Sequence, residues 1–145
     1  MVALKSKGTT QQRQGMEAKV KHLEFIQAAI NRMAGNSFLL KGWTVTLTGG
    51  LLALTFKQID RHYLIISLAV LLLFWFLDSY YLSRERRFIA LYNAVRTKKE
   101  EDTDFSMDTR SFGKMCRWVH CAFSRTMLLF YGGLLAVHLL IVHFI

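Results

Sequence analysis

The cysteines and histidines in the last third of the chain are the residue types best suited to metal binding or catalysis. Cys116, His120 and Cys121 lie close together, and His138 and His143 are five residues apart. Zinc sites usually combine two pairs of ligands, but this Cys-x₄-Cys spacing has no second pair. The two late histidines stand near the end of an apolar segment, where histidine is more often an interfacial polar residue than a ligand or proton relay. With no phosphate-binding loop or nucleophile elbow either, the sequence predicts no enzyme activity, metal or cofactor.

A lysine and an aspartate are the only charges embedded in two apolar segments, and their spacing favours an ion pair. Lys41 lies eighteen residues before Ile59, and Asp78 lies nineteen residues after it. At a rise of about 1.5 Å per residue, both would reach the same depth on antiparallel helices joined near Ile59. Opposite charges that meet in a poorly hydrated place relieve much of each other's cost. Alternatively, Lys41 extends to the lipid headgroups and Asp78 stays at the interface.

Small residues form a stripe along the first apolar segment. Its members, which we call the small-residue seam, are spaced four, three and four residues apart: Gly42, Thr46, Gly49 and Ala53. Such a seam predicts close approach of another helix, either from the same chain or from a second copy.

Polar residues form a neighbouring stripe. Thr44, Thr48 and Thr55 follow Lys41 at helical spacing, and we call these three residues the threonine stripe. In an oligomer with the stripe turned inward, the hydroxyls would wet a central pore. Alternatively, each threonine bonds back to the carbonyl four residues earlier and faces lipid.

These stripes require helices that cross a membrane. Residues 42–56 and 63–77 carry no charge, and a helix needs about 20 apolar residues to cross about 30 Å of hydrocarbon. A short polar turn at 57–62 separates them, so residues 37–82 are predicted to form a transmembrane helical hairpin. Residues 126–145 have no formal charge and are predicted to form a third transmembrane helix.

The remaining segments are polar or amphipathic. Residues 1–15 are predicted to be a disordered basic tail. Residues 16–36 are predicted to be an amphipathic cytoplasmic helix, and Gly35-Asn36 allows a bend before the membrane. Residues 83–125 are predicted to hold cytoplasmic helices and a loop, with Ser111 as the cap of a third helix that runs into the membrane. The expected fold is an all-α membrane protein with three long helices, each with a transmembrane half and an amphipathic cytoplasmic extension.

The distribution of the positive charge predicts the topology. The formal net charge is +9, and only two of the 19 lysines and arginines lie in the 57–62 turn. By the positive-inside rule, the N-terminus and residues 84–117 are cytoplasmic, and the C-terminus lies outside. An anionic leaflet accounts for most of the basicity without a specific nucleic acid partner. Four basic residues are the expected surface for lipid or a soluble partner: Arg84, Arg86, Arg87 and Lys114.

Two stretches resemble a group of small bacterial membrane proteins. They are residues 31–43 (NRMAGNSFLLKGW) and residues 78–88 (DSYYLSRERRF), with Leu91-Tyr92 and Val95-Arg96, and the similarity covers about residues 17–110. In size and hairpin layout, such proteins resemble the membrane effectors of antiphage systems, which a cytoplasmic sensor triggers to permeabilise the inner membrane. The resemblance implies no catalytic or ligand-binding positions.

Two functions are therefore expected, in order of preference. The first is a homo-oligomeric protein of the bacterial inner membrane that forms or gates a pore, as an effector in antiphage defence. The alternative is a non-conducting anchor or adaptor, whose basic cytoplasmic bundle recruits a soluble partner or a nucleotide signal.

Overall fold

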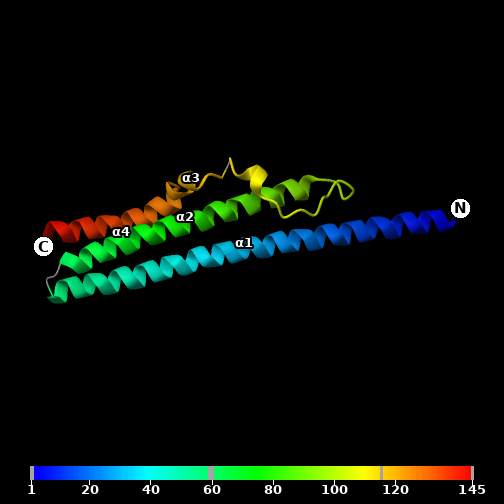
Figure 1. The fold of residues 1–145 in the computed structure, drawn as a ribbon. Helices are drawn as coiled ribbons and strands as arrows, with labels where there is room; N and C mark the ends of the chain where they lie inside the picture. The colour runs from blue at the N-terminus through cyan, green and yellow to red at the C-terminus, as the bar shows by residue number, and fades with distance from the viewer. Residues whose placement is uncertain (1, 59–60, 115, 145) are drawn as a thin grey trace.

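Two long antiparallel helices lie side by side and form the frame of the computed structural model (Figure 1). The structure describes residues 2–58, 61–114 and 116–144, with the side chains of 11–55, 62–114 and 116–143. Its elements are α1 (Val2–Gln58), α2 (Arg61–Thr97), the short 3₁₀ turn η1 (Arg110–Phe112), α3 (Trp118–Ala122) and α4 (Arg125–Phe144). No strand occurs in these ranges, so the all-α prediction is confirmed.

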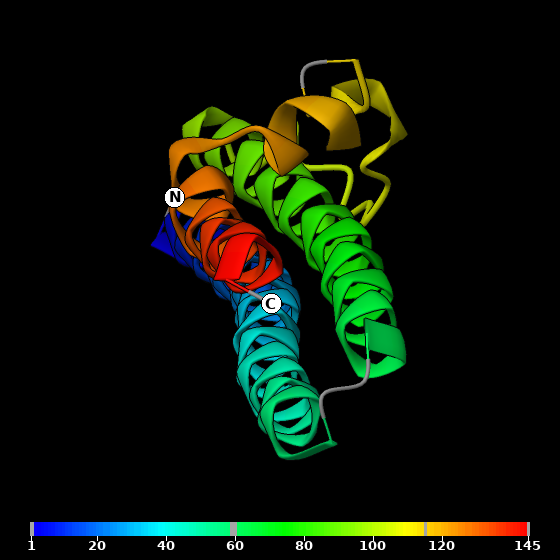
Figure 2. The same ribbon diagram turned by 90° about the vertical axis from the view of Figure 1, so that its left-hand side faces the viewer.

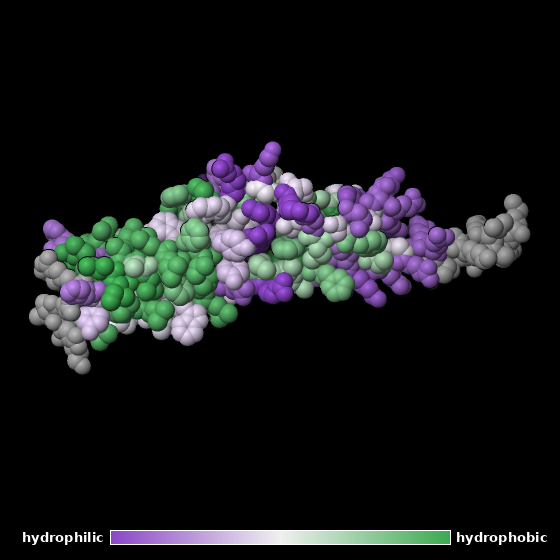
Figure 3. All heavy atoms as spheres, in the orientation of Figure 1, coloured by the Kyte–Doolittle hydropathy of each residue, from purple (hydrophilic) through white to green (hydrophobic). Residues whose placement is uncertain are grey.

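Three helices are long and apolar enough to cross a membrane, namely α1, α2 and α4. On the face shown in Figure 3, apolar side chains gather over the end of the molecule where α4 lies, and polar side chains are more frequent farther along, with apolar ones among them. We call residues 37–55, 62–82 and 126–143 the apolar half, and the remaining described residues the polar half. The prediction of three such helices is confirmed, whereas the 59–60 turn between α1 and α2 lies outside the described residues.

The predicted N-terminal tail and the predicted bend in α1 are both wrong. A single helix of 57 residues, about 85 Å long, begins at Val2 and includes residues 2–15. It also continues through Gly35 without a positive φ angle. The physical reason is that a helix, once nucleated, gains one hydrogen bond per added residue, and one glycine costs only about 1 kcal/mol.

In the polar half, α1 and α2 form a two-helix stalk (residues 11–36 and 83–97). Its core consists of the buried side chains of Ile26, Ile30, Leu91 and Val95. Lys19 donates hydrogen bonds from α1 to the carbonyls of Arg96 and Lys98. A cation at these unpaired carbonyls stabilises the C-terminal end of α2.

The third amphipathic extension predicted from Ser111 is not a continuous helix. The segment contains η1, an irregular stretch and the five-residue α3, and α4 begins only at Arg125. Side chains of α2 bind carbonyls of this segment: Trp75 Nε1 lies 3.1 Å from the oxygen of Ala122, and Ser83 Oγ lies 2.7 Å from that of Cys116. Tertiary hydrogen bonds thus satisfy groups that would otherwise require a longer helix.

Helix α4 packs against the apolar half of α2. Leu71, Met127 and Tyr131 form the buried centre of this contact, and the rings of Trp75 and Tyr131 stack with centroids 5.8 Å apart. In the view along the bundle, the near ends of α1, α2 and α4 form a triangle (Figure 2). The fold thereby places polar side chains of three helices around one interior.

Candidate functional site

A buried carboxylate links all three helices of the apolar half. Asp78 on α2 has no exposed side-chain surface, and its Oδ2 lies 2.6 Å from Nζ of Lys41 on α1. Ser37 donates a hydrogen bond to the other carboxylate oxygen, and Lys41 also lies 2.8 Å from Ser37 Oγ. From α4, the hydroxyl of Tyr131 donates to Asp78 Oδ2 over 3.0 Å. We call these four residues the Asp78 cluster.

The geometry explains how a charge is accommodated at this depth. A buried carboxylate is stable only when a cation faces it and hydrogen bonds satisfy its remaining lone pairs. Lys41 meets the first requirement with a side chain that is 22% exposed, while Ser37 and Tyr131 meet the second. The depth argument from sequence found the charged pair, but it gave no signal for the serine or the tyrosine.

The threonine stripe is buried within the single chain, whereas the sequence predicted that it lines a pore between copies or faces lipid. All three side chains are buried. Each hydroxyl donates to the carbonyl four residues earlier: Thr44 to Leu40 over 2.7 Å, Thr48 to Thr44 over 2.6 Å, and Thr55 to Leu51 over 3.1 Å. The bonds to carbonyls within α1 that were predicted as the alternative to a pore are therefore present, but the side chains that make them are covered by the chain itself.

A second polar layer lies farther along the bundle. His138 on α4 is buried, and its Nε2 is 2.8 Å from Ser67 Oγ on α2. Its Nδ1 is 2.8 Å from the carbonyl oxygen of Leu134, and Ser67 Oγ is 3.4 Å from the oxygen of Thr48 on α1. The expectation that His138 is interfacial is therefore wrong. Histidine spacing alone could not reveal this, since the partner serine lies on another helix.

The small-residue seam lies on the outer face of α1. All four of its residues are exposed in the single chain. A Cβ atom added at Gly42 or Gly49 would meet nothing within 4 Å. The seam is therefore not used for packing within the chain, and this face of α1 is available to lipid or to another helix.

The cysteine-histidine group does not form a joint site. Cys116 and Cys121 are buried, whereas His120 is exposed. In the described part of the chain, no three histidine, cysteine or acidic side chains are grouped closely enough to hold a metal ion. Burial raises the pKa of the Cys121 thiol, although Arg86 lies 3.6 Å from its sulfur and opposes the shift.

The four predicted basic residues do not form one uniform surface. Arg84 lies over the ring of Tyr80, with its guanidinium carbon 5.2 Å from the ring centroid. Arg86 contacts Cys121, as described above, and Arg87 is half-buried near Gly113. Only Lys114 and part of Arg86 remain as freely exposed positive charge. Arg86 and Arg87 therefore lie against the 110–124 segment, whereas Arg84 contacts its own helix.

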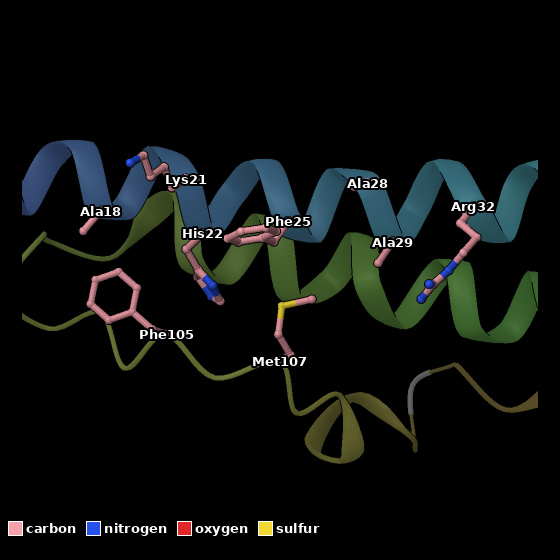
Figure 4. Close-up of a pocket in the computed structure, with 9 residues that line it drawn as sticks. All are labelled: Ala18, Lys21, His22, Phe25, Ala28, Ala29, Arg32, Phe105 and Met107. Atoms are coloured by element: carbon pink, nitrogen blue, oxygen red, sulfur yellow. The ribbon is translucent and has the colours of Figure 1, made fainter.

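A groove lies on the stalk, and no motif or spacing in the sequence predicts it. It has a volume of about 870 Å³ and lies between α1 and the loop that follows α2 (Figure 4). The side chains of His22, Ala29 and Arg32 project from α1 toward the loop residues Phe105 and Met107. Four further residues of α1 complete the lining: Ala18, Lys21, Phe25 and Ala28. We call this the stalk groove.

The loop wall of the stalk groove is ordered by its own side chains. Asp104, Ser106 and Asp108 each accept a hydrogen bond from the backbone N–H two residues later, over 2.9–3.3 Å. Phe105, between the first two, has a φ angle of 52°, and its ring meets that of His22 edge-on with centroids 5.6 Å apart. Since a non-glycine residue rarely adopts this backbone conformation, the surrounding turns must hold it.

Comparison with known proteins gives no relative from which a role could be transferred. No protein-family model, curated protein or solved structure matches this chain.

Proposed function

We propose that this protein is a non-conducting membrane anchor that presents the stalk groove to a soluble cytoplasmic partner. One observation carries the proposal: the polar groups of the apolar half are satisfied inside the chain, whereas the groove in the polar half leaves large apolar side chains exposed. Phe25 is 68% exposed there, and Phe105 and Met107 are 46% and 40% exposed. Exposed apolar surface of this kind is typical of interaction sites.

The difference in polarity between the two halves also supports the anchor proposal. The three apolar helices supply attachment to the bilayer. The polar part of α1 extends from residue 36 back to residue 2, a distance of about 50 Å. The Arg32 end of the groove lies about 7 Å along α1 from residue 37, where the apolar half begins, and the Ala18 end lies about 28 Å from it. The groove thus extends away from the bilayer, where a soluble protein can reach it.

Site-specific photocrosslinking in cells tests the anchor proposal. A photoreactive amino acid at Phe25 should form an adduct with a soluble protein, whereas the same probe at Leu129, an exposed position of the apolar half, should not. Purified protein in liposomes should leave an ion gradient intact. Rapid loss of the gradient, with no adduct at Phe25, would reject the anchor in favour of a pore.

A second candidate is the homo-oligomeric pore or effector of antiphage defence. The observation that favours it is the outward-facing small-residue seam, along which copies of α1 can approach closely. The threonine stripe does not support this candidate unless the three-helix bundle opens, since its hydroxyls are bonded within α1. The liposome measurement above separates the two candidates.

A further inference from the structure

We propose that the stalk groove binds an amphipathic helix of the partner, with an apolar face and acidic residues about three turns apart. The inference rests on the proposed anchor function and specifies the chemistry of the partner. It follows from the shape of the groove, its small and aromatic lining, and its charges.

The shape of the groove matches a helix. Its lining residues on α1 recur at steps of three and four residues from Ala18 to Arg32, a length of about 21 Å. Three alanines keep the floor shallow, so that another helix can lie close to α1. The exposed ring of Phe25 stands at the centre, where an aromatic anchor contributes most to binding.

The charges of the groove specify acidic residues on the partner. Lys21 and Arg32 are exposed lining residues eleven positions apart, which is about three helical turns, and no acidic side chain lines the groove. Charge complementarity fixes the register and the choice of partner more than it adds affinity. An acidic residue near each end of the partner's apolar face would meet these two cations.

The ring of His22 lies beneath the surface of the groove. His22 is only 5% exposed, and its Nε2 has no hydrogen-bond partner within the described parts of the chain. Because this nitrogen has almost no exposed surface, the docked helix contacts Phe25, Lys21 and Arg32 instead. Phe105 fixes the histidine ring from the loop side.

Two other occupants fit less well. A second copy of this chain would bring the same two cations, Lys21 and Arg32, toward their equivalents in a parallel arrangement, and like charges disfavour such a contact. A lipid bilayer can reach only one end of the groove, since Arg32 lies nine residues, or about 14 Å, from Lys41 along α1, whereas Lys21 lies twenty residues, or about 30 Å, from it.

Fluorescence anisotropy with two designed peptides tests the proposal on the full-length protein in phosphatidylcholine nanodiscs. The probe is a labelled 18-residue amphipathic helix with a leucine and alanine face and two glutamates eleven residues apart. The second peptide has lysines in place of these glutamates. We expect the glutamate peptide to bind about tenfold more tightly than the lysine peptide, because its glutamates attract Lys21 and Arg32 whereas lysines repel them.

Charge reversal supplies the decisive comparison. The Lys21→Glu/Arg32→Glu variant should no longer bind the glutamate peptide and should bind the lysine peptide instead. The control variant is Arg96→Glu/Lys114→Glu, which changes the charge by the same amount at exposed positions outside the groove. It should bind the two peptides with the wild-type preference. Ala28→Trp should block both peptides by filling the groove. If reversal does not exchange the preference, the acidic helix is the wrong partner.

The remaining outcomes identify what would replace the proposal. Binding of anionic phosphatidylglycerol vesicles, but of neither peptide, would assign the groove to lipid. Concentration-dependent dimerisation that Ala28→Trp abolishes would assign it to a second copy. If the Phe25 probe still captures a soluble protein while the glutamate peptide fails, the anchor function stands and only the helical partner is rejected.

Discussion

Tyr131 and Asp78 are joined by a hydrogen bond of 3.0 Å, made to the same carboxylate oxygen that Lys41 approaches within 2.6 Å. One oxygen atom therefore connects α4 to the α1–α2 hairpin through a neutral donor and a cation. This arrangement makes the last helix dependent on a charge pair that belongs to the first two, and its consequences can be measured.

The first prediction concerns the charge pair. Lys41→Met leaves a fully buried carboxylate without its cation and should destabilise the bundle by roughly 3–5 kcal/mol. Asp78→Asn should cost less, since Lys41 is already partly exposed and can extend toward headgroups. Unfolding free energies in bicelles for both single variants and the double variant measure the coupling. Additive losses would contradict a direct interaction.

The second prediction concerns the attachment of α4. Tyr131→Phe keeps the ring stacked on Trp75 but removes the hydroxyl that donates to Asp78. A hydrogen bond to a charged group contributes about 1.5–3 kcal/mol. We expect increased hydrogen exchange in α4 with little change in the stalk. Tyr81→Phe is the matched control, and equal exchange in the two variants would argue against the link.

The third prediction concerns thiol reactivity. Burial raises the pKa of Cys121, so less thiolate is present at a given pH than for an exposed cysteine. In a Cys116→Ser background, maleimide should label Cys121 slowly and more rapidly as the pH rises. A single cysteine introduced at the exposed Lys114, with both native cysteines replaced by serine, should react quickly. Equal rates in the folded protein would show that Cys121 is accessible.

The fourth prediction concerns assembly. Gly49→Leu adds a side chain where a Cβ meets nothing within 4 Å, so the fold of the single chain should be unchanged. If the small-residue seam is an interface between copies, this variant should lose crosslinked ladders in the membrane. Leu47→Phe, which enlarges an exposed side chain outside the seam, should retain them. Ladders that survive Gly49→Leu would place assembly elsewhere.

The fifth prediction concerns topology. Because basic residues flank the predicted inner ends of the apolar helices, a reporter fused after residue 145 should be active outside the cytoplasm. One inserted near residue 103, in the loop between α2 and η1, should be active inside it. A C-terminal reporter that is active in the cytoplasm would mean that α4 does not cross the bilayer.

The sequence by itself determined the helical class and the three apolar helices. Hydrophobicity over 15 to 20 residues is a local property of the sequence. A chain that enters a membrane must also pair its backbone N–H and C=O groups within each helix. Counting residues from Ile59 also placed Lys41 and Asp78 at one depth, since helical rise is constant. These inferences needed no knowledge of which helix faces which.

Only the tertiary structure decided how the faces of the helices are used. Spacing placed Thr48 and Gly49 on neighbouring stripes of α1, but packing of α1 against α2 buried Thr48 and left Gly49 exposed. Tyr131 and Ser67 have no local sequence signal, because each is hydrogen-bonded to a residue more than fifty positions away in the sequence. The stalk groove likewise exists only where a loop folds back on α1. Rotation of a helix about its axis is set by packing with its neighbours, and no single segment carries that information.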